Sequence, residues 1–186
     1  MLMVCLVTML ASVSSSLLAK EATAETPQAA TAATTPVEWP VRGRTLFKVW
    51  GFEIYFATLK APPGFVPDLY AETPFSLTLE YRRSFTGVDI ARRSIEEMQK
   101  QSALSEEEAK RWGLQLQQLF PDVAKGDSIT GRYVPGKGAD FTLNGRALGR
   151  IDDPALAQRF FAIWLSPRTS EPEMRQALIG PKGNGR

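Results

Sequence analysis

Apolar and polar residues alternate most clearly over residues 75–82. Phe75, Leu77, Leu79 and Tyr81 alternate with Ser76, Thr78, Glu80 and Arg82, which predicts a strand with one buried side and one side in water. Aromatic and β-branched residues dominate residues 46–50 and 52–59, with Gly51 between them. These residues predict two strands joined by a tight turn, or one bulged strand. The run Pro62-Pro63-Gly64 then ends the strand, because proline cannot donate to a ladder.

Two helices are predicted after these strands. Thr86 and Asp89 have capping-box spacing, and the residues that then share one helical face are Ile90, Ser94, Ile95 and Met98. Ser105 and Glu108 repeat this start signal. The buried stripe expected of the second helix is Ala109, Trp112, Leu116, Leu119 and Phe120.

The last third of the chain predicts a three-stranded meander followed by two more helices. Residues 127–151 alternate again, and Asn144-Gly145 is a strong hairpin signal. Asp153 before Pro154 starts a helix, and a last short helix is expected from Ser170. Runs of strands and runs of helices, without strict alternation, predict an α+β fold: an antiparallel sheet with helices on one face.

The residues before this domain predict export. Residues 2–19 are apolar or small, and Ala22-Thr23-Ala24 is typical of a cleavage site, so residues 1–24 are interpreted as a signal peptide. An uncleaved membrane anchor is the alternative. We expect residues 25–37 to form a flexible Ala/Thr/Pro linker, residues 38–180 the folded domain and residues 181–186 a disordered tail. The expected location is periplasmic or secreted, with membrane contact only through an uncleaved leader.

Composition excludes several kinds of chemistry. The 186 residues include no His and one Cys, Cys5, which lies in the leader. A mature chain without imidazole or thiol has no Ser-His-Asp or Cys-His nucleophile and no Cys/His zinc site. The formal net charge of +2 gives no reason to expect nucleic acid as a partner. No glycine-rich phosphate loop is present, and we expect neither a metal nor a cofactor.

Several segments, in order along the chain, resemble the chalcone-isomerase-like family, particularly its bacterial secreted branch. They are Gly51–Leu59, Leu79–Arg83 leading into Thr86-Gly87, Phe120–Val123, Gly126-Asp127, Pro135-Gly136, Asn144–Arg146, Ile163–Leu165 and Met174–Gly180. The resemblance covers about residues 40–180. It implies an open-faced β-sandwich, in which a long antiparallel sheet carries a helical layer with a ligand cleft between them. The family includes enzymes that cyclise chalcones, plastid proteins that bind fatty acids, and bacterial members without an established reaction.

The resemblance also implies site residues. The family's enzymes use an Arg from the first core strands with a Thr, a Tyr and an Asn. The Thr position resembles Tyr55, and the Tyr and Asn positions resemble Ile90 and Glu97, so two catalytic partners are replaced and chalcone isomerase activity is not expected. An Arg with Tyr55 is similar to the pair that holds the carboxylate in the fatty-acid-binding members. That Arg is Arg44 or Arg42, and the spacing to Tyr55 does not decide between them.

Each candidate residue also has a structural interpretation. Arg44 and Tyr55 form a carboxylate clamp in the functional interpretation. In the structural one, both lie in solvent at the sheet edge, or Arg44 pairs with Glu53 across the strands; residue type alone favours the structural one. The arginines 82, 83, 92 and 93 form a basic cleft mouth, bind an anionic surface partner, or form a solvated face balanced by Glu96 and Glu97; the pattern favours the solvated face. The aromatic residues Trp112, Phe160, Phe161 and Trp164 line a tunnel or, as helical spacing favours, simply form the core. Asp153 and Asp127 are interpreted as a helix cap and a turn residue.

The sequence therefore predicts a non-catalytic protein of the cell envelope that binds a small amphipathic carboxylate, such as a fatty acid. One alternative is an isomerase or lyase in which the Arg stabilises an oxyanion and the Tyr donates a proton. The other alternative is an envelope interaction module without a ligand.

Overall fold

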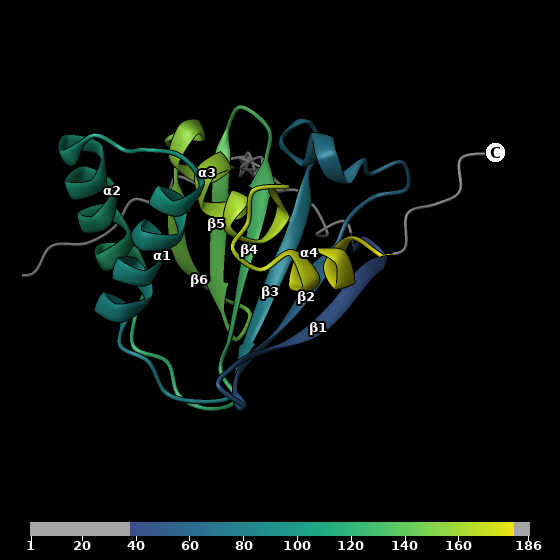
Figure 1. The fold of residues 1–186 in the computed structure, drawn as a ribbon, viewed down its shortest axis with the longest axis horizontal. Coiled ribbons are helices and arrows are strands. Elements are labelled where there is room, and N and C mark those ends of the chain that lie inside the picture. Colours follow the sequence, from purple (N-terminus) through teal and green to yellow (C-terminus); the bar gives the residue numbers. More distant parts are fainter. Residues whose placement is uncertain (1–37, 181–186) are drawn as a thin grey trace, which may run out of the picture. The chain divides into compact units, whose positions relative to one another are not determined.

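Six strands form one antiparallel sheet whose order follows the chain, β1-β2-β3-β4-β5-β6. The computed structural model describes residues 38–180, so the predictions for the leader, Cys5, the linker and the tail fall outside it. The strands are β1 (Val41–Val49), β2 (Phe52–Lys60), β3 (Phe75–Tyr81), β4 (Ser128–Val134), β5 (Gly138–Leu143) and β6 (Arg146–Ile151). The predicted meander is confirmed, and the α+β class is confirmed with it (Figure 1).

Local signals place the first three helices. The helices are α1 (Gly87–Gln101), α2 (Glu106–Leu119), α3 (Pro154–Leu165) and α4 (Pro172–Ile179). Thr86 caps α1 by accepting from the backbone N–H of Asp89, and Ser105 forms a reciprocal capping box with Glu108 at the start of α2. Asp153 caps α3 through two backbone N–H groups. Each cap satisfies donors that have no partner within the helix, which fixes where the helix begins.

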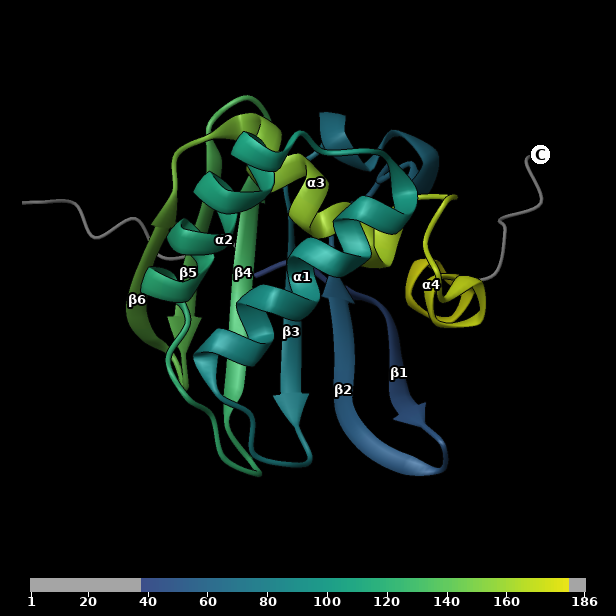
Figure 2. The ribbon, with the colours of Figure 1, turned by 60° about the vertical axis from the view of Figure 1, so that its left-hand side comes forward.

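The helices cover one face of the sheet (Figures 1 and 2). Within this layer α3 packs on β5 and β6, and α4 packs on β1 and β2. Gly43 allows α4 to come this close, because a Cβ there would collide with the backbone oxygen of Ala177. In contrast, α1 packs mainly on α2 and α3. Helix α1 therefore stands off the sheet, whereas α4 lies directly against β1 and β2.

The core lies between α3 and the middle of the sheet. Phe75 of β3 packs edge-on against Phe161 of α3, with ring centroids 5.0 Å apart, and stacks on Tyr133 of β4 at 5.1 Å. Such aromatic pairs contribute about 1 kcal/mol each beyond their burial. This cluster fixes the distance between α3 and the strands.

Two element boundaries and one additional element differ from the sequence prediction. Strand β1 begins at Val41 and not near Leu46, since pairing with β2 orders its polar half as well. A 3-10 helix, η1 (Pro67–Glu72), forms in the segment after the Pro-Pro-Gly run and was not predicted; its Tyr70 is buried. Helix α4 begins at Pro172 and not at Ser170, because the Ser170 hydroxyl donates to Glu97 of α1.

Candidate functional site

A cavity of about 650 Å³ lies between α1 and the sheet. Strands β1 to β5 form one wall, while α1, α3 and the start of α4 form the other. Its position follows from the packing of α1, which rests on α2 and α3 and leaves space over β1, β2 and β3. A second hollow, of about 300 Å³, lies between the end of α1 and α3 and is smaller.

Apolar and aromatic side chains form most of the cavity wall. The strands supply Leu77, Leu79 and Ile129, and α3 supplies Phe160, Phe161, Ile163 and Trp164. The aromatic residues of α3 are buried, as the core interpretation predicts, but three of the four aromatic candidates also line the cavity. Trp112 of α2 is the exception, since it is buried outside the cavity and its indole N–H donates to Asp153, the N-cap residue of α3.

Two phenols stand side by side in this wall. Tyr55 of β2 and Tyr81 of β3 are paired across the strands, with ring centroids 6.2 Å apart, and both line the cavity. The indole Nε1 of Trp164 donates a hydrogen bond to the Tyr55 hydroxyl at 3.1 Å. The Tyr55 hydroxyl itself donates only to the sulfur of Met174, a weak acceptor, at 3.9 Å. Within residues 38–180 the Tyr81 hydroxyl has no hydrogen-bond partner, and it is not sealed from the cavity. The site thus contains two hydroxyl protons without a strong acceptor.

Burial keeps both phenols protonated. Desolvation raises the pKa of Tyr55 well above its ordinary value of 10.0, and the hydrogen bond from Trp164 offsets only part of that effect. Desolvation likewise raises the pKa of Tyr81, and the neighbouring Tyr55 adds to it. Near neutral pH the two groups are therefore hydrogen-bond donors, not bases.

Charged side chains border the open side of the cavity. Arg93 of α1 pairs with Glu97 at 2.7 Å, and Glu97 also accepts from Lys100 and Ser170. Partial burial raises the pKa of Glu97, but these hydrogen bonds and the charge of Arg93 outweigh burial and leave the pKa below its ordinary value. Arg92 pairs with two acids in the same way. The arginines of α1 are balanced by acids, as the solvated-face interpretation predicts, and they still border the cavity.

The expected clamp of Arg44 or Arg42 with Tyr55 is not assembled. Arg44 is exposed, pairs with Glu80 at 3.3 Å and lies 4.1 Å over the ring of Phe56. Phe56 and Tyr55 are consecutive in β2, so their side chains lie on opposite faces of the sheet. Arg42 is exposed as well, and neither arginine lines the cavity. The placement of a first-strand guanidinium in the cleft is therefore corrected. Arg44 is exposed, as one structural alternative had it, and its acidic partner is Glu80, not the Glu53 of the other alternative.

The other family-derived positions do meet at the cavity. Ile90 and Glu97 both line it, as the resemblance implies for the positions that they occupy. Tyr81 was predicted only as part of the buried side of β3. The only sequence feature that pointed to a functional role for Tyr81 was its hydroxyl, a polar atom on the otherwise apolar side of β3. That Tyr81 lies opposite Tyr55 could be known only from the register of β2 and β3.

No helix of residues 38–180 is long and apolar enough to cross a bilayer. Over the same residues, no three His, Cys, Asp or Glu side chains come together as metal ligands.

Comparison with known proteins identifies the family. The family model described as "Chalcone isomerase-like" matches residues 39–180. The chain belongs to the chalcone isomerase-like family. The resemblance that the sequence segments indicated is confirmed.

A solved structure supports the fold of this family member. The chain is similar to the crystal structure of a fatty-acid binding protein from Arabidopsis thaliana, with a TM-score of 0.55 and 9% sequence identity. The match covers 76% of this chain and 87% of the plant protein. At this identity the likeness shows the shared fold alone. A comparison with curated proteins finds no match.

Proposed function

We propose that the protein binds a small amphipathic carboxylate, such as a fatty acid, in the cavity between α1 and the sheet. The observation that carries this proposal is a cavity of about 650 Å³ with a largely apolar wall and two phenols without a strong acceptor. Small-molecule sites typically have volumes of about 300–1,000 Å³ and few, well-placed polar groups. The fatty-acid binding protein with the same fold lends support to a lipid-like ligand.

The ligand's two ends are matched by different parts of the wall. Tyr55 and Tyr81 donate to the carboxylate, and hydrogen bonds to a charged acceptor are stronger than neutral ones. The hydrocarbon tail lies against Leu77, Leu79 and the aromatic side chains of α3. Burial of the tail contributes roughly 25 cal/mol per Å² of apolar surface, so affinity rises with chain length until the cavity is filled.

Binding is favoured over catalysis by the same geometry. An isomerase or lyase of the expected kind needs an Arg and a Tyr at one reacting atom, but Arg44 and Tyr55 face opposite sides of the sheet. A general acid or base works best with a pKa near the working pH, and burial moves the pKa of Tyr55 further from neutrality. A module without a ligand would have its cleft filled by side chains, whereas this cavity is open.

A location in the periplasm or outside the cell is part of the proposal. It rests on residues 1–24 acting as a signal peptide. Mass spectrometry of the protein purified from its own host tests this. We expect the mass of a chain that begins after Ala24, together with a co-purified carboxylate. A retained leader would contradict the export step, and the ligand proposal is tested separately.

Calorimetry with delipidated protein tests the binding site. We expect fatty acids to bind with affinity that rises with chain length, and their methyl esters to bind more weakly. Tyr55→Phe and Tyr81→Phe should each weaken binding about tenfold or more, because each removes a donor to a charged group. The matched controls are Arg44→Ala and Tyr133→Phe. Arg44 lies on the opposite face of the sheet from the cavity, and the Tyr133 hydroxyl donates to the carbonyl of Ala71 outside the cavity. Absence of heat with every chain length, or unchanged affinity in both cavity variants, would refute the proposal.

A further inference from the structure

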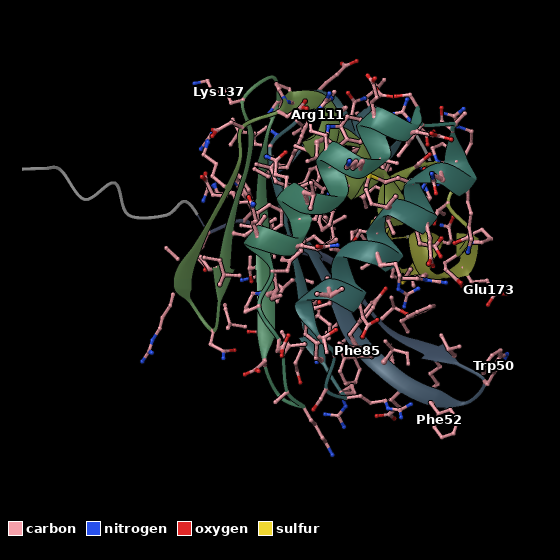
Figure 3. The ribbon with its side chains drawn as sticks, turned by 90° about the vertical axis from the view of Figure 1, so that its left-hand side faces the viewer. Trp50, Phe52, Phe85, Arg111, Lys137 and Glu173 are labelled. Carbon is pink, nitrogen blue, oxygen red and sulfur yellow. The ribbon has the colours of Figure 1, made fainter. Side chains whose placement is uncertain are left out.

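The tip of the β1–β2 hairpin exposes large apolar side chains. Trp50 is 94% exposed and Phe52 is 59% exposed. Figure 3 shows both side chains at the end of this hairpin, directed away from the rest of the molecule. Within residues 38–180 the indole of Trp50 takes part in no hydrogen bond and no aromatic pair. No hydrogen bond or aromatic contact within residues 38–180 thus holds the indole.

Turn chemistry does not account for Trp50 either, as the other two-residue hairpin shows. The Trp50-Gly51 turn has φ values of 49° and 83°, and the Asn144-Gly145 turn between β5 and β6 has values of 50° and 79°. Positive φ at both positions is the type I′ conformation, which favours Asn-Gly and disfavours a bulky residue at the first position. The chain therefore uses the favoured residue in one turn and an unfavourable one in the other. The presence of Trp at the exposed tip, against the preference of the turn, points to an interaction partner for the indole.

The tip is continuous with the mouth of the cavity. Val49 and Trp50 both line the cavity, so apolar surface extends from the exposed indole to the interior wall. Phe85, labelled in Figure 3 near the base of α1, is also part of this lining. A partner that contacts the tip is thus placed directly at the opening of the ligand site.

Cations flank the exposed aromatic rings. The guanidinium of Arg83 lies 5.1 Å from the ring centroid of Phe52. Arg83 and Lys48 are exposed, and neither has an acid within salt-bridge distance among residues 38–180. Trp side chains favour the headgroup region of a bilayer, because the amphipathic indole contacts both lipid tails and water there. Lys and Arg side chains near this region are attracted to anionic lipids. This combination matches a lipid surface in both charge and polarity.

We propose that the β1–β2 tip docks on the surface of a phospholipid bilayer that contains anionic lipid. Trp50 and Phe52 enter the headgroup region, Lys48 and Arg83 contact lipid phosphates, and the cavity mouth faces the membrane. The docking rests on the exposed surface, and it does not require the cavity ligand to be a fatty acid.

Flotation of the delipidated protein with lipid vesicles tests the docking. The first residue of the purified protein is determined beforehand, so that the leader does not affect the comparison. The probes are phosphatidylcholine vesicles with and without phosphatidylglycerol, and all variants carry the same N-terminus. We expect flotation with the anionic vesicles, at least tenfold weaker binding for Trp50→Asn, and weaker binding for Phe52→Ser. Trp50→Asn copies the chain's own second turn, so the fold is retained. Leu114→Gln is the matched control, because Leu114 is 51% exposed and belongs to α2, a helix that lies far from the β1–β2 hairpin in Figures 1 and 2.

Charge and self-association provide the remaining outcomes. The double variant Lys48→Gln with Arg83→Gln should lose the preference for phosphatidylglycerol and the sensitivity of binding to salt. Binding of Trp50→Asn equal to that of the unaltered protein would overturn the proposal. A second result would also overturn the proposal: the protein does not float with vesicles, and it forms a dimer in solution that Trp50→Asn dissociates. The tip would then bind a second copy of the protein and not a membrane. Calorimetry with fatty acids in the absence of vesicles is a separate readout, in which Phe52→Ser should bind as the unaltered protein does.

Discussion

Trp50 and Asn144 occupy the same position in two turns of nearly identical backbone conformation. The side chain of Asn144 is integrated into its surroundings, since it accepts from the backbone N–H of Ser128 and donates to Asp127. That of Trp50 is almost fully exposed. A single residue type therefore separates a turn built for stability from one built, as we propose, for contact with lipid.

Trp50→Asn should stabilise the folded protein. The left-handed conformation costs an ordinary residue about 1–2 kcal/mol and costs Asn less, while the exposed indole contributes little burial. We expect the free energy of unfolding in urea to rise by about 1 kcal/mol. Trp50→Ala is the control, because it removes the indole and keeps the backbone cost, so it should leave stability nearly unchanged. A Trp50→Asn protein less stable than the original would show that the indole is held by contacts within the fold.

The residue scale also shows how far the candidate site follows from sequence. Tyr55 was predicted from the family resemblance, and it lies in the cavity. Arg44 was predicted from the same resemblance, and it lies on the other face over Phe56. The face on which a strand residue lies depends on its register with the neighbouring strand, and β1 has two register shifts against β2. Counting residues from Tyr55 could not reveal those shifts.

At the scale of elements, Asp153 joins two helices. One carboxylate oxygen caps α3 through the backbone N–H groups of Ala155 and Leu156, and the other accepts from the indole N–H of the buried Trp112 in α2 at 3.0 Å. The cap was predicted from Asp153-Pro154, but the contact with α2 was not. The carboxylate thus fixes both the start of α3 and its position against α2.

Asp153→Ala should destabilise the protein by about 2–4 kcal/mol. The loss of the cap costs about 1 kcal/mol, and a buried indole N–H left without an acceptor costs about 1–3 kcal/mol more. Asp153→Asn has one acceptor oxygen in place of two, so its loss should be intermediate. Asp152→Ala is the control, since Asp152 is exposed and its ion pair with Arg150 should contribute less than about 1 kcal/mol. Urea unfolding measures all three, and equal effects of the two Ala variants would argue against the joint role of Asp153.

Helix α1 shows why the cavity is a property of several elements together. Its caps and apolar positions predict a helix, and the structure has one. Those positions do not say that α1 rests on α2 and α3 and stays off the first strands. The size of the opening depends on the aromatic residues of α3 between α1 and the sheet, and the contact of Ser170 with Glu97 secures α1 to the segment before α4.

At the scale of the whole molecule, all four tyrosines have raised pKa values. Burial raises the pKa of Tyr70 to about 12, and it raises the pKa of Tyr55, Tyr81 and Tyr133 as well. In the unfolded chain a phenol loses its proton near pH 10. The folded state holds these protons more tightly, so their contribution to folding is fully present below about pH 10 and is lost as the pH rises further.

Titration by phenolate absorbance should show this difference directly. We expect little phenolate in the folded protein near pH 10, followed at higher pH by a cooperative rise that coincides with unfolding. The protein unfolded in urea should titrate near pH 10 throughout. Tyr133→Phe and Tyr81→Phe should each reduce the loss of stability with rising pH. A folded-state phenol that titrates at its ordinary value would contradict the burial described for these residues.

The sequence by itself determined the features that neighbouring residues create. The strand alternation of residues 75–81, the caps at Thr86, Ser105 and Asp153, and the turn at Asn144-Gly145 were all readable, because each depends on hydrogen bonds or side-chain direction within a few residues. Together they were sufficient for the α+β class, and the motif order pointed to the family. The tertiary structure alone decided which side chains face the cavity. Strand register and the packing of α3 bring three residues that are far apart in the chain together there, namely Tyr55, Tyr81 and Trp164. The register of β1 with β2 likewise places Arg44 on the opposite face of the sheet.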